Sequence, residues 1–540
     1  MTMVTFPSAD QIPEAARIDV SRWDRQWLCN GEIRTWAGAT APVRSPVCVM
    51  QPGKREPEPV EIGQIAMIDR DAGLEALTAA KIAWDHGRGM WATMRVGERI
   101  ERMTTFVGGM RAAREDLVRL LMWEIGKSRA DSETEVDRTV VYIQDTIEAL
   151  KELDRNGARF SVTGGFVGQI RRSPLGVVLC MGPFNYPLNE TFTTLIPALI
   201  MGNTIVSKLP RFGQLVILPL LAAFRDAFPA GAVNIFQADG PTVIGPIMES
   251  GDVDSLAFIG SSRVANILKR QHPRPNRLRC ITGLESKNPA VILPSADLDQ
   301  AVKECVSGAL SFNGQRCTAL KLIFAHADIA EDFVARLAKA VDALTAGMPW
   351  EKVTLTPLPE PGRPAYMRGL VDDAVAHGAR IVHGPGGDGG ASHGSFFRPA
   401  VVFPVAPGAR LYKEEQFGPV VPVTTFRELD EIDHFMRMSP YGQQISLFGT
   451  DPRQLAQLVD ALVNSVCRIN INSQCRRGPD AWPFTGRKDS AEGTLSVSDA
   501  LRAFSIRTVV ATTATDANQD LVGEIVTRRL SSFLTTDFLF

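Results

Sequence analysis

The chain has 540 residues, of which 45% are hydrophobic and 22% are charged, and its formal net charge is −2. This is the composition of an ordinary globular chain with two or three domains, and the small net charge argues against a general nucleic-acid binder. The longest apolar runs are shorter than a membrane span, and no signal peptide is recognisable at the acidic N-terminus.

The first third of the chain is dominated by helical patterns. Residues 1–60 are rich in Pro and Gly and predict an extended segment. Apolar residues at helical spacing predict helices over residues 72–91, 96–124 and 132–153. Residues 158–173 alternate in short pieces around a Gly-Gly pair, which predicts a hairpin arm.

From residue 176 onward, strands and helices alternate. Buried strands are predicted at residues 176–181, 204–208, 232–236, 255–259 and 279–284, and helices at residues 188–201, 214–228, 241–250 and 263–270. This α/β alternation predicts a doubly wound parallel sheet, which binds ligands at the carboxyl ends of its strands. Residues 350–400 are rich in Pro and Gly, and the densest run, 384–390, predicts a surface loop.

Cys317 is the candidate nucleophile among eight cysteines, which form no CxxC pair and favour reduced thiols in a cytoplasmic enzyme. It lies beside Arg316, and a nearby cation lowers the pKa of a thiol, as a nucleophile requires. A lone cysteine is more often a buried structural residue. However, the sequence Phe-Asn-Gly-Gln-Arg-Cys-Thr at residues 312–318 resembles the nucleophile motif of the aldehyde dehydrogenase superfamily. It is most similar to the NADP-dependent non-phosphorylating glyceraldehyde-3-phosphate dehydrogenase branch.

Asn185 lies in the sequence Pro-Phe-Asn-Tyr-Pro at residues 183–187. Taken alone, prolines around an asparagine indicate a rigid turn. The sequence resembles the family motif in which the asparagine amide donates to the developing oxyanion, a role that a fixed amide donor can fill. The resemblance therefore implies that Cys317 attacks the aldehyde and Asn185 stabilises the oxyanion, giving a thiohemiacetal and then a thioester that water cleaves.

Three further stretches resemble the family's cofactor-binding motifs. They supply Lys208 and Arg211, then Gly260 and Ser261 in a short turn before a helix, and Glu415 and Phe417 in a Glu-x-Phe-Gly-Pro motif. A Gly-Ser turn at a helix N-terminus presents free N–H groups to an anion, although it is also a common helix cap. Arg211 stands where NAD-preferring members carry a glutamate, and a guanidinium favours a 2′-phosphate. The resemblance thus implies NADP, with NAD possible.

Substrate binding is assigned to Arg138, Tyr186, Arg316 and Arg477, which stand where the glyceraldehyde-3-phosphate branch is similar. Guanidinium groups bind phosphate through two hydrogen bonds, so a converging set suits a short phosphorylated aldehyde. Each arginine alone would more often be a surface charge or, for Arg138, part of an ion pair within a helix.

One departure from the family concerns the base that activates the deacylating water. Gly283 stands where the family carries its glutamate, and Glu285 lies two residues further on, which makes it the candidate base. Two alternatives stay open: an acylating enzyme that passes the acyl group to coenzyme A, and a catalytically silent member that acts as an oligomeric scaffold.

The resemblance also divides the chain into domains. Residues 1–156 and 173–281 form the cofactor-binding domain, 157–172 the oligomerisation arm, 282–486 the α/β catalytic domain, 487–515 an oligomerisation strand region and 516–540 a C-terminal tail. We expect the apolar tail to be disordered or to pack on a neighbouring subunit. The expected assembly is a homodimer or homotetramer, with no metal, nucleic acid or membrane partner.

Overall fold

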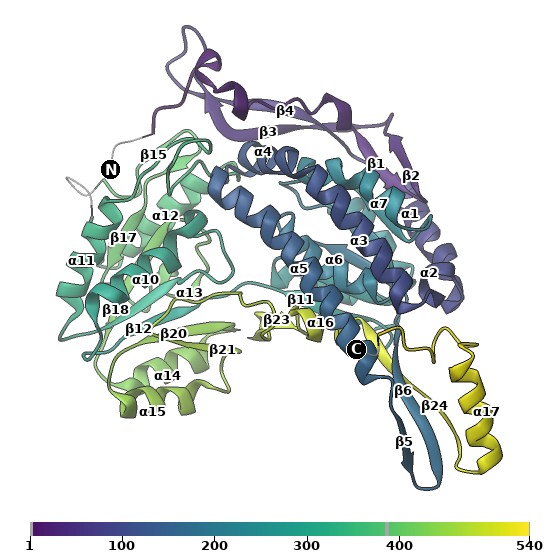
Figure 1. Cartoon of the computed structure of the whole chain (residues 1–540). Helices are drawn as coiled ribbons and strands as arrows, with labels where there is room; N and C mark the ends of the chain where they lie inside the picture. The colour runs from purple at the N-terminus through teal and green to yellow at the C-terminus, as the bar shows by residue number, and fades with distance from the viewer. Residues whose placement is uncertain (1–3, 384–387, 539–540) are drawn as a thin grey trace.

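Two sheets of mostly parallel strands form two α/β bodies that face each other, and a three-stranded arm projects from the first body (Figure 1). The computed structural model describes residues 4–383 and 388–538. Within these ranges no helix is both long enough and apolar enough to cross a lipid bilayer.

The first sheet has eight strands in the order β2-β1-β9-β8-β7-β10-β11-β23. Its strands are β1 Gln26–Cys29, β2 Glu32–Thr35, β7 Val177–Met181, β8 Thr204–Lys208, β9 Val233–Phe236, β10 Ser255–Ile259, β11 Arg279–Gly283 and β23 Ala491–Glu492. β9, β8, β7, β10 and β11 are parallel, and β1 and β23 pair with them antiparallel. The predicted doubly wound sheet is confirmed. Its strand order reverses between β7 and β10, where such sheets open a crevice for a ligand.

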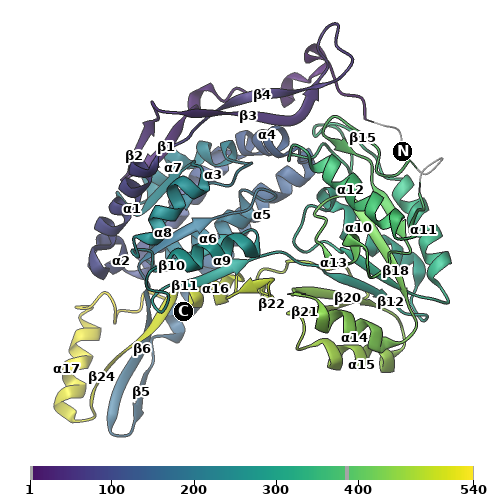
Figure 2. The same ribbon diagram turned by 180° about the vertical axis from the view of Figure 1, so that it is seen from behind.

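Helices cover both faces of the first sheet (Figures 1 and 2). They are α1 Arg70–Trp84, α2 Met90–Thr93, α3 Val96–Ala112, α4 Arg114–Ile125, α5 Arg129–Asn156, α6 Asn189–Ile200, α7 Leu221–Ala227, α8 Gly245–Glu249 and α9 Ser262–Gln271. The helix predicted over residues 96–124 is two helices, because the backbone leaves helical geometry at Ala113. The helix predicted from residue 214 begins as a 3-10 turn, Leu215–Leu220, since Pro219 lacks a backbone donor.

The second sheet has seven strands in the order β14-β17-β18-β13-β12-β20-β21, all parallel except β14. Its strands are β12 Pro289–Ile292, β13 Leu322–His326, β14 Arg380–Ile381, β17 Ala400–Phe403, β18 Val420–Phe426, β20 Gln444–Phe448 and β21 Arg468–Ile471. The surrounding helices are α10 Leu298–Leu310, α11 Ala330–Asp342, α12 Arg363–Ala376, α13 Arg410–Lys413, α14 Leu429–Met438 and α15 Pro452–Leu462. Only residues 284–288 separate β11 of the first sheet from β12 of the second.

The surface loop predicted at 384–390 falls largely on residues 384–387, which lie outside the described residues. The Pro- and Gly-rich segment around it is more ordered than its composition suggests. It contains α12, β14, β17 and a small hairpin of β15 Ser392–His393 and β16 Phe396–Phe397. Pro364 at the start of α12 explains part of this difference, because proline is favoured in the first turn of a helix.

The arm consists of β5 Phe160–Thr163, β6 Phe166–Pro174 and β24 Ser505–Thr513, and it confirms the predicted hairpin. β24 pairs with β6 along its whole length. The remaining elements are β3 Thr40–Val49 and β4 Glu58–Ala66 in the N-terminal segment, β19 Tyr441–Gly442 and β22 Arg487–Lys488, and the helices α16 Val497–Ala503 and α17 Asp516–Thr527.

The C-terminal tail differs from its prediction, because it packs on its own chain. After α17, which lies beside the arm in Figure 1, the chain returns to the first body. The backbone N–H groups of Asp537 and Phe538 donate to Asp154 Oδ2 on α5 at 2.9 and 3.2 Å. The Asp537 carboxylate in turn accepts from the N–H of Gly97 on α3 at 2.9 Å. The expectation of a disordered tail is therefore wrong for these residues, and packing on a neighbouring subunit stays a prediction.

Candidate active site

One cavity of about 1300 Å³ lies at the carboxyl ends of β7 and β10, where the first body faces the second. The residues assigned from the sequence come from both bodies, and every one of them lines this cavity: Arg138, Asn185, Tyr186, Lys208, Arg211, Gly260, Ser261, Glu285, Arg316, Cys317, Glu415, Phe417 and Arg477. The topology therefore brings together motifs that are far apart in the sequence. Their individual roles stay predictions.

The loop that carries Cys317 is held in one conformation. Phe312, Asn313 and Gly314 all have positive φ angles, of 49°, 55° and 70°. A Cβ atom at Gly314 would lie 2.6 Å from two backbone oxygens, so only glycine fits there. The Asn313 side chain fixes the loop by donating to Thr356 Oγ1 at 3.1 Å and accepting from its N–H at 3.0 Å.

The backbone carbonyl of Cys317 is also fixed. It accepts hydrogen bonds from the Ser286 hydroxyl, from Asn288 Nδ2 at 2.8 Å and from Lys321 Nζ at 2.9 Å. Ser286 and Asn288 belong to the short crossover between the two sheets. The nucleophile loop is thus attached to the segment that joins the two bodies.

The expected lowering of the Cys317 pKa by Arg316 is not found. Burial and the nearby Glu190 carboxylate raise the pKa of the thiol, and Lys321 and Arg477 oppose them. Arg316 contributes little because its Nη2 donates to the carbonyls of Ser307 and Gly308, at 3.1 and 2.7 Å. In this state the side chain at position 317 is therefore a thiol, and forming the thiolate requires a proton acceptor or a bound cation.

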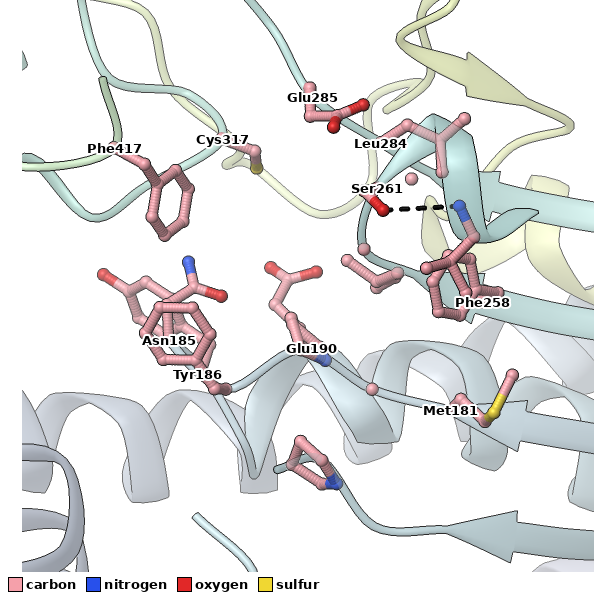
Figure 3. Close-up of a pocket in the computed structure, with 18 of the residues that line it drawn as sticks. Met181, Asn185, Tyr186, Glu190, Phe258, Ser261, Leu284, Glu285, Cys317 and Phe417 are labelled. Carbon is pink, nitrogen blue, oxygen red and sulfur yellow. Dashed lines mark hydrogen bonds between the residues drawn. The ribbon is translucent and has the colours of Figure 1, made fainter. Parts of the chain in front are cut away.

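Asn185 follows β7 and is held at both ends. Its Nδ2 donates to the carbonyl of Gln315 at 2.8 Å, and its own carbonyl accepts from Lys127 Nζ at 2.9 Å. Lys127 is fully buried, pairs with Glu135 and lies 3.6 Å from the centre of the Tyr186 ring. Figure 3 shows the Asn185 amide below Cys317, with its nitrogen directed toward the cavity. A fixed amide beside the nucleophile is the geometry that an oxyanion donor needs.

Glu285 is bound at the other side of the cavity from Asn185 (Figure 3). Its Oε2 accepts from the backbone N–H of Ser262 at 2.8 Å, at the N-terminus of α9. The carboxylate thus occupies a donor in the turn that was expected to bind pyrophosphate. Gly283 ends β11 on the cavity wall and provides no carboxylate there.

The residues assigned to the cofactor lie on the part of the cavity formed by the first body. Lys208 ends β8, and burial lowers its pKa to about 8. Arg211 is exposed, with its guanidinium 5.4 Å from the centre of the Phe212 ring. Ser261 caps α9 by accepting from Val264 N at 3.4 Å (Figure 3).

Glu415 and Phe417 close the second-body side of the cavity. Glu415 accepts from Ser286 N at 3.1 Å and from Lys321 Nζ at 2.5 Å. The Phe417 ring lies 5.8 Å from that of Phe184. The two bodies therefore meet through an aromatic pair at this point of the cavity.

The three arginines assigned to the substrate all have partners within the protein. Arg138 forms two hydrogen bonds with Asp480, at 2.9 and 3.3 Å, and Arg316 binds backbone carbonyls as described above. Arg477 pairs with Glu190, with 2.8 Å between Nη1 and Oε2. The positive charges of Arg138 and Arg477 are therefore each balanced by a carboxylate of the protein.

Glu190 was missed by the sequence reasoning. It lies in α6, all of whose residues are buried, and it is 7% exposed where it reaches the cavity wall. A carboxylate in a buried helix with no other ionisable side chain, five residues after Asn185, was the available signal. An ionisable side chain is almost never buried without a partner or a function.

The aldehyde dehydrogenase family model matches residues 48–510. The NADP-dependent glyceraldehyde-3-phosphate dehydrogenase of Streptococcus equinus is 31% identical over 451 residues, which cover 82% of this chain and 92% of that protein. Retinal dehydrogenase 2 of Mus musculus is 29% identical over 477 residues, covering 86% and 88%.

Among solved structures, the NADP-dependent glyceraldehyde-3-phosphate dehydrogenase from Bacillus halodurans C-125, complexed with NADP, superposes with a TM-score of 0.82. It is 27% identical, and the superposition covers 91% of this chain and 100% of that one. With the family match spanning most of the chain and the site geometry above, this chain belongs to the aldehyde dehydrogenase family.

Proposed function

We propose that this protein uses NADP to oxidise a short phosphorylated aldehyde, such as glyceraldehyde 3-phosphate, to the carboxylic acid through Cys317. The observation that supports this most directly is the single cavity that unites Cys317, Asn185 and three arginines with the cofactor-binding residues. The names of the relatives agree with this reaction, and the eight free cysteines favour a reducing compartment such as the cytoplasm.

The residues present fit a dinucleotide carrying a 2′-phosphate. The cavity exceeds the roughly 300–1,000 Å³ that drug-sized ligands occupy, so it can hold a dinucleotide and an aldehyde together. At Gly260 a Cβ would lie 2.4 Å from the Phe258 ring, so a glycine suits this position of the turn. Lys208 and Arg211 would bind the 2′-phosphate, and Gly260 and Ser261 the pyrophosphate.

When bound, NADP supplies the oxidant for the aldehyde. The chain's own residues do the remaining work. The thiolate of Cys317 adds to the aldehyde carbon, and the Asn185 amide stabilises the oxygen that becomes negatively charged. Oxidation then leaves a thioester on Cys317, which water must cleave. Glu285, the base predicted from the sequence, and Glu190 both reach the cavity and are the candidates for that step.

Three guanidinium groups on the cavity wall support a phosphorylated substrate. Arg138 and Arg477 are held by Asp480 and Glu190, so a substrate phosphate would compete with these carboxylates. The Arg138 side chain is 33% exposed, against 5% for Arg477. Arg138 is therefore the first choice for a direct phosphate contact.

A second candidate function is transfer of the acyl group to coenzyme A. The observation that favours it is Gly283, which leaves the position of the family's base without a carboxylate. In that case the enzyme would release about one NADPH per chain and stop until coenzyme A is added. The two functions share every step up to the thioester.

The arm supports a proposal about assembly. Its exposed apolar side chains are Phe160, Val162, Phe166, Ile170, Ile506, Val509 and Val510. Large apolar residues gathered on a projecting sheet mark an interface, so we propose that copies of this chain associate through the arm as a dimer or tetramer.

The experiment compares glyceraldehyde 3-phosphate with glyceraldehyde, using NADP and NAD. Wild-type enzyme should favour the phosphorylated aldehyde and NADP, and Cys317→Ala should not reduce the cofactor. Arg138→Gln should lower kcat/KM about 10- to 150-fold for the phosphorylated aldehyde alone, the value of one charge-assisted hydrogen bond. Arg114→Gln breaks a comparable arginine–aspartate pair outside the cavity and is the matched control. Equal efficiency with both aldehydes would refute the substrate assignment.

A further inference from the structure

Hydrolysis of the thioester needs a carboxylate that can accept a proton from water, and the family's own position for it is a glycine, Gly283. Glu285 is engaged with the backbone of Ser262. We propose that Glu190, on the opposite wall of the cavity, is the base that activates the deacylating water. This proposal rests on the function proposed above.

The position of Glu190 carries the proposal. Its residue lies in the first turn of α6, directly after the Asn185 motif, and lines the same cavity as Cys317. In Figure 3 the Glu190 carboxylate points up from α6 while the Cys317 sulfur points down from its loop, so both are directed into the space between them. Asn185 lies beside Glu190 in the same view. A water molecule near an acyl group on Cys317 would therefore lie on the side of the cavity that carries the Glu190 carboxylate and the Asn185 amide.

The hydrogen bonds of Glu190 leave one of its oxygens available. Oε2 accepts from Arg477 Nη1 at 2.8 Å. Among the described residues no hydrogen bond to Oε1 is found, so this oxygen can accept one from water. Glu285 likewise has one oxygen engaged, because its Oε2 accepts from the backbone N–H of Ser262 at the N-terminus of α9.

The electrostatics of Glu190 suit a base. Burial raises its pKa above the usual value for a glutamate, and Arg477 and Arg138 limit the rise. A raised pKa brings a carboxylate closer to neutral pH, where a base works most efficiently. Glu190 is also the charged group that acts most strongly on the Cys317 thiol, so the two side chains are electrostatically coupled.

Arg477 acts as a positioning residue for Glu190. Its Nη2 donates to the carbonyl of Leu495 at 3.1 Å, and its guanidinium lies 4.4 Å from the centre of the Phe484 ring. Since Arg477 is only 7% exposed, these contacts fix the direction from which it holds the carboxylate.

Glu190 takes a proton from water as the water oxygen bonds to the acyl carbon, and Asn185 stabilises the tetrahedral oxyanion. The C–S bond then breaks and Cys317 leaves as a thiolate. The proton held by Glu190 returns to the sulfur, and the acid is released. Water is consumed, and no oxidant or reductant is needed.

The test uses p-nitrophenyl acetate with the full-length protein and no cofactor. Attack by Cys317 releases p-nitrophenol and leaves an acetyl thioester, so the burst reports acylation and the steady phase reports deacylation. Glu190→Gln should give a burst of about one p-nitrophenol per chain and a steady phase about 10²–10⁴-fold slower. Intact-mass spectrometry should show the acetylated chain accumulating.

Three comparisons make the outcome decisive. Glu249→Gln changes an exposed glutamate outside the cavity and should leave both phases unchanged. A normal steady phase in Glu190→Gln, or a stalled phase in Glu285→Gln instead, would overturn the proposal. If Cys317→Ala still gives the burst, the proposed function fails and the role of Glu190 fails with it, whereas a burst lost in Cys317→Ala beside a normal steady phase in Glu190→Gln refutes the role of Glu190 alone.

A second variant keeps the test valid if Glu190→Gln folds poorly. Arg477→Lys keeps the positive charge but loses the fixed geometry, whereas Arg477→Gln removes the charge that lowers the pKa of Glu190. The rate of wild-type deacylation should rise with pH as a single group loses its proton, and the pKa of that group should lie above that of a free glutamate. Arg477→Gln should shift this profile to higher pH, and Arg477→Lys should shift it less. A profile that neither variant moves would refute the proposal.

Discussion

Replacing Arg211 by glutamate should shift cofactor preference from NADP toward NAD. Arg211 is exposed at the cavity edge, and among the described residues it forms no ion pair. Its charge is therefore available to a 2′-phosphate. A glutamate at this position would repel the phosphate and could accept a hydrogen bond from the 2′-hydroxyl of NAD.

The size of the shift follows from one charge-assisted hydrogen bond. Such a bond contributes roughly 1.5–3 kcal/mol, which corresponds to about 10- to 150-fold in affinity. Because Arg211 is exposed, solvent and salt screen the interaction, so the lower end of the range applies. Lys208 stays in place and keeps part of the affinity for the phosphate. We therefore expect a change of about tenfold in the ratio of the two dissociation constants.

The assay is a fluorescence titration of wild-type and Arg211→Glu protein with NADP and NAD, without aldehyde. Arg225→Glu changes the net charge equally, outside the cavity, and should leave the ratio unchanged. The shift should shrink at 1 M salt, where screening extends over only about 3 Å. Equal affinity of the wild-type protein for both cofactors, or a ratio that Arg211→Glu does not move, would refute the reasoning.

Three other perturbations address the pH dependence, the oxyanion site and the core. Burial lowers the pKa of Lys208 to about 8, so the lysine loses its charge as pH rises from 7 to 9 and the preference for NADP should fall. A preference that does not depend on pH would contradict this. Asn185→Ala should slow the acylation burst about 10²-fold or more, and an unchanged burst would exclude an oxyanion role. Burial raises the pKa of Glu124 to about 7, although it accepts backbone hydrogen bonds from Gln214 and Leu215. Because the pKa of Glu124 is raised in the folded state, the free energy of unfolding should fall as pH rises from about 4.5 to 7. Glu124→Gln should reduce the slope of this free energy against pH by up to about 1.4 kcal/mol per pH unit, as measured by thermal unfolding.

The sequence predicted those parts of the fold and the site that depend on short stretches of neighbouring residues. The strand–helix alternation predicted the first sheet, because each strand is a continuous buried run bounded by turns. Cys317 and Asn185 were found for a similar reason, since their loops need particular residues at fixed spacing. Glycine, for example, is the only residue type that fits at position 314, between two carbonyl oxygens.

The parts that the sequence did not predict depend on contacts between distant residues. Glu190 and Arg477 are 287 residues apart, and nothing local in either segment indicates that they meet. Arg316 is adjacent to Cys317 in sequence, but its side chain turns toward α10 and contributes little to the thiol. The tail was misjudged because its partner, Asp154, lies 383 residues earlier.

The pairing of β24 with β6 has a consequence for synthesis of the chain. β6 ends at Pro174 and its partner begins at Ser505, about 330 residues later, which at roughly 5–20 residues per second takes from a quarter of a minute to about a minute. During that time one edge of β6 has no partner, and an unpaired edge invites association with other nascent chains. β6 carries Arg171, Arg172 and Pro174, the kinds of residue that discourage pairing with a foreign strand. These side chains thus protect the arm on the ribosome, before Arg172 binds the Ser505 hydroxyl in the finished fold.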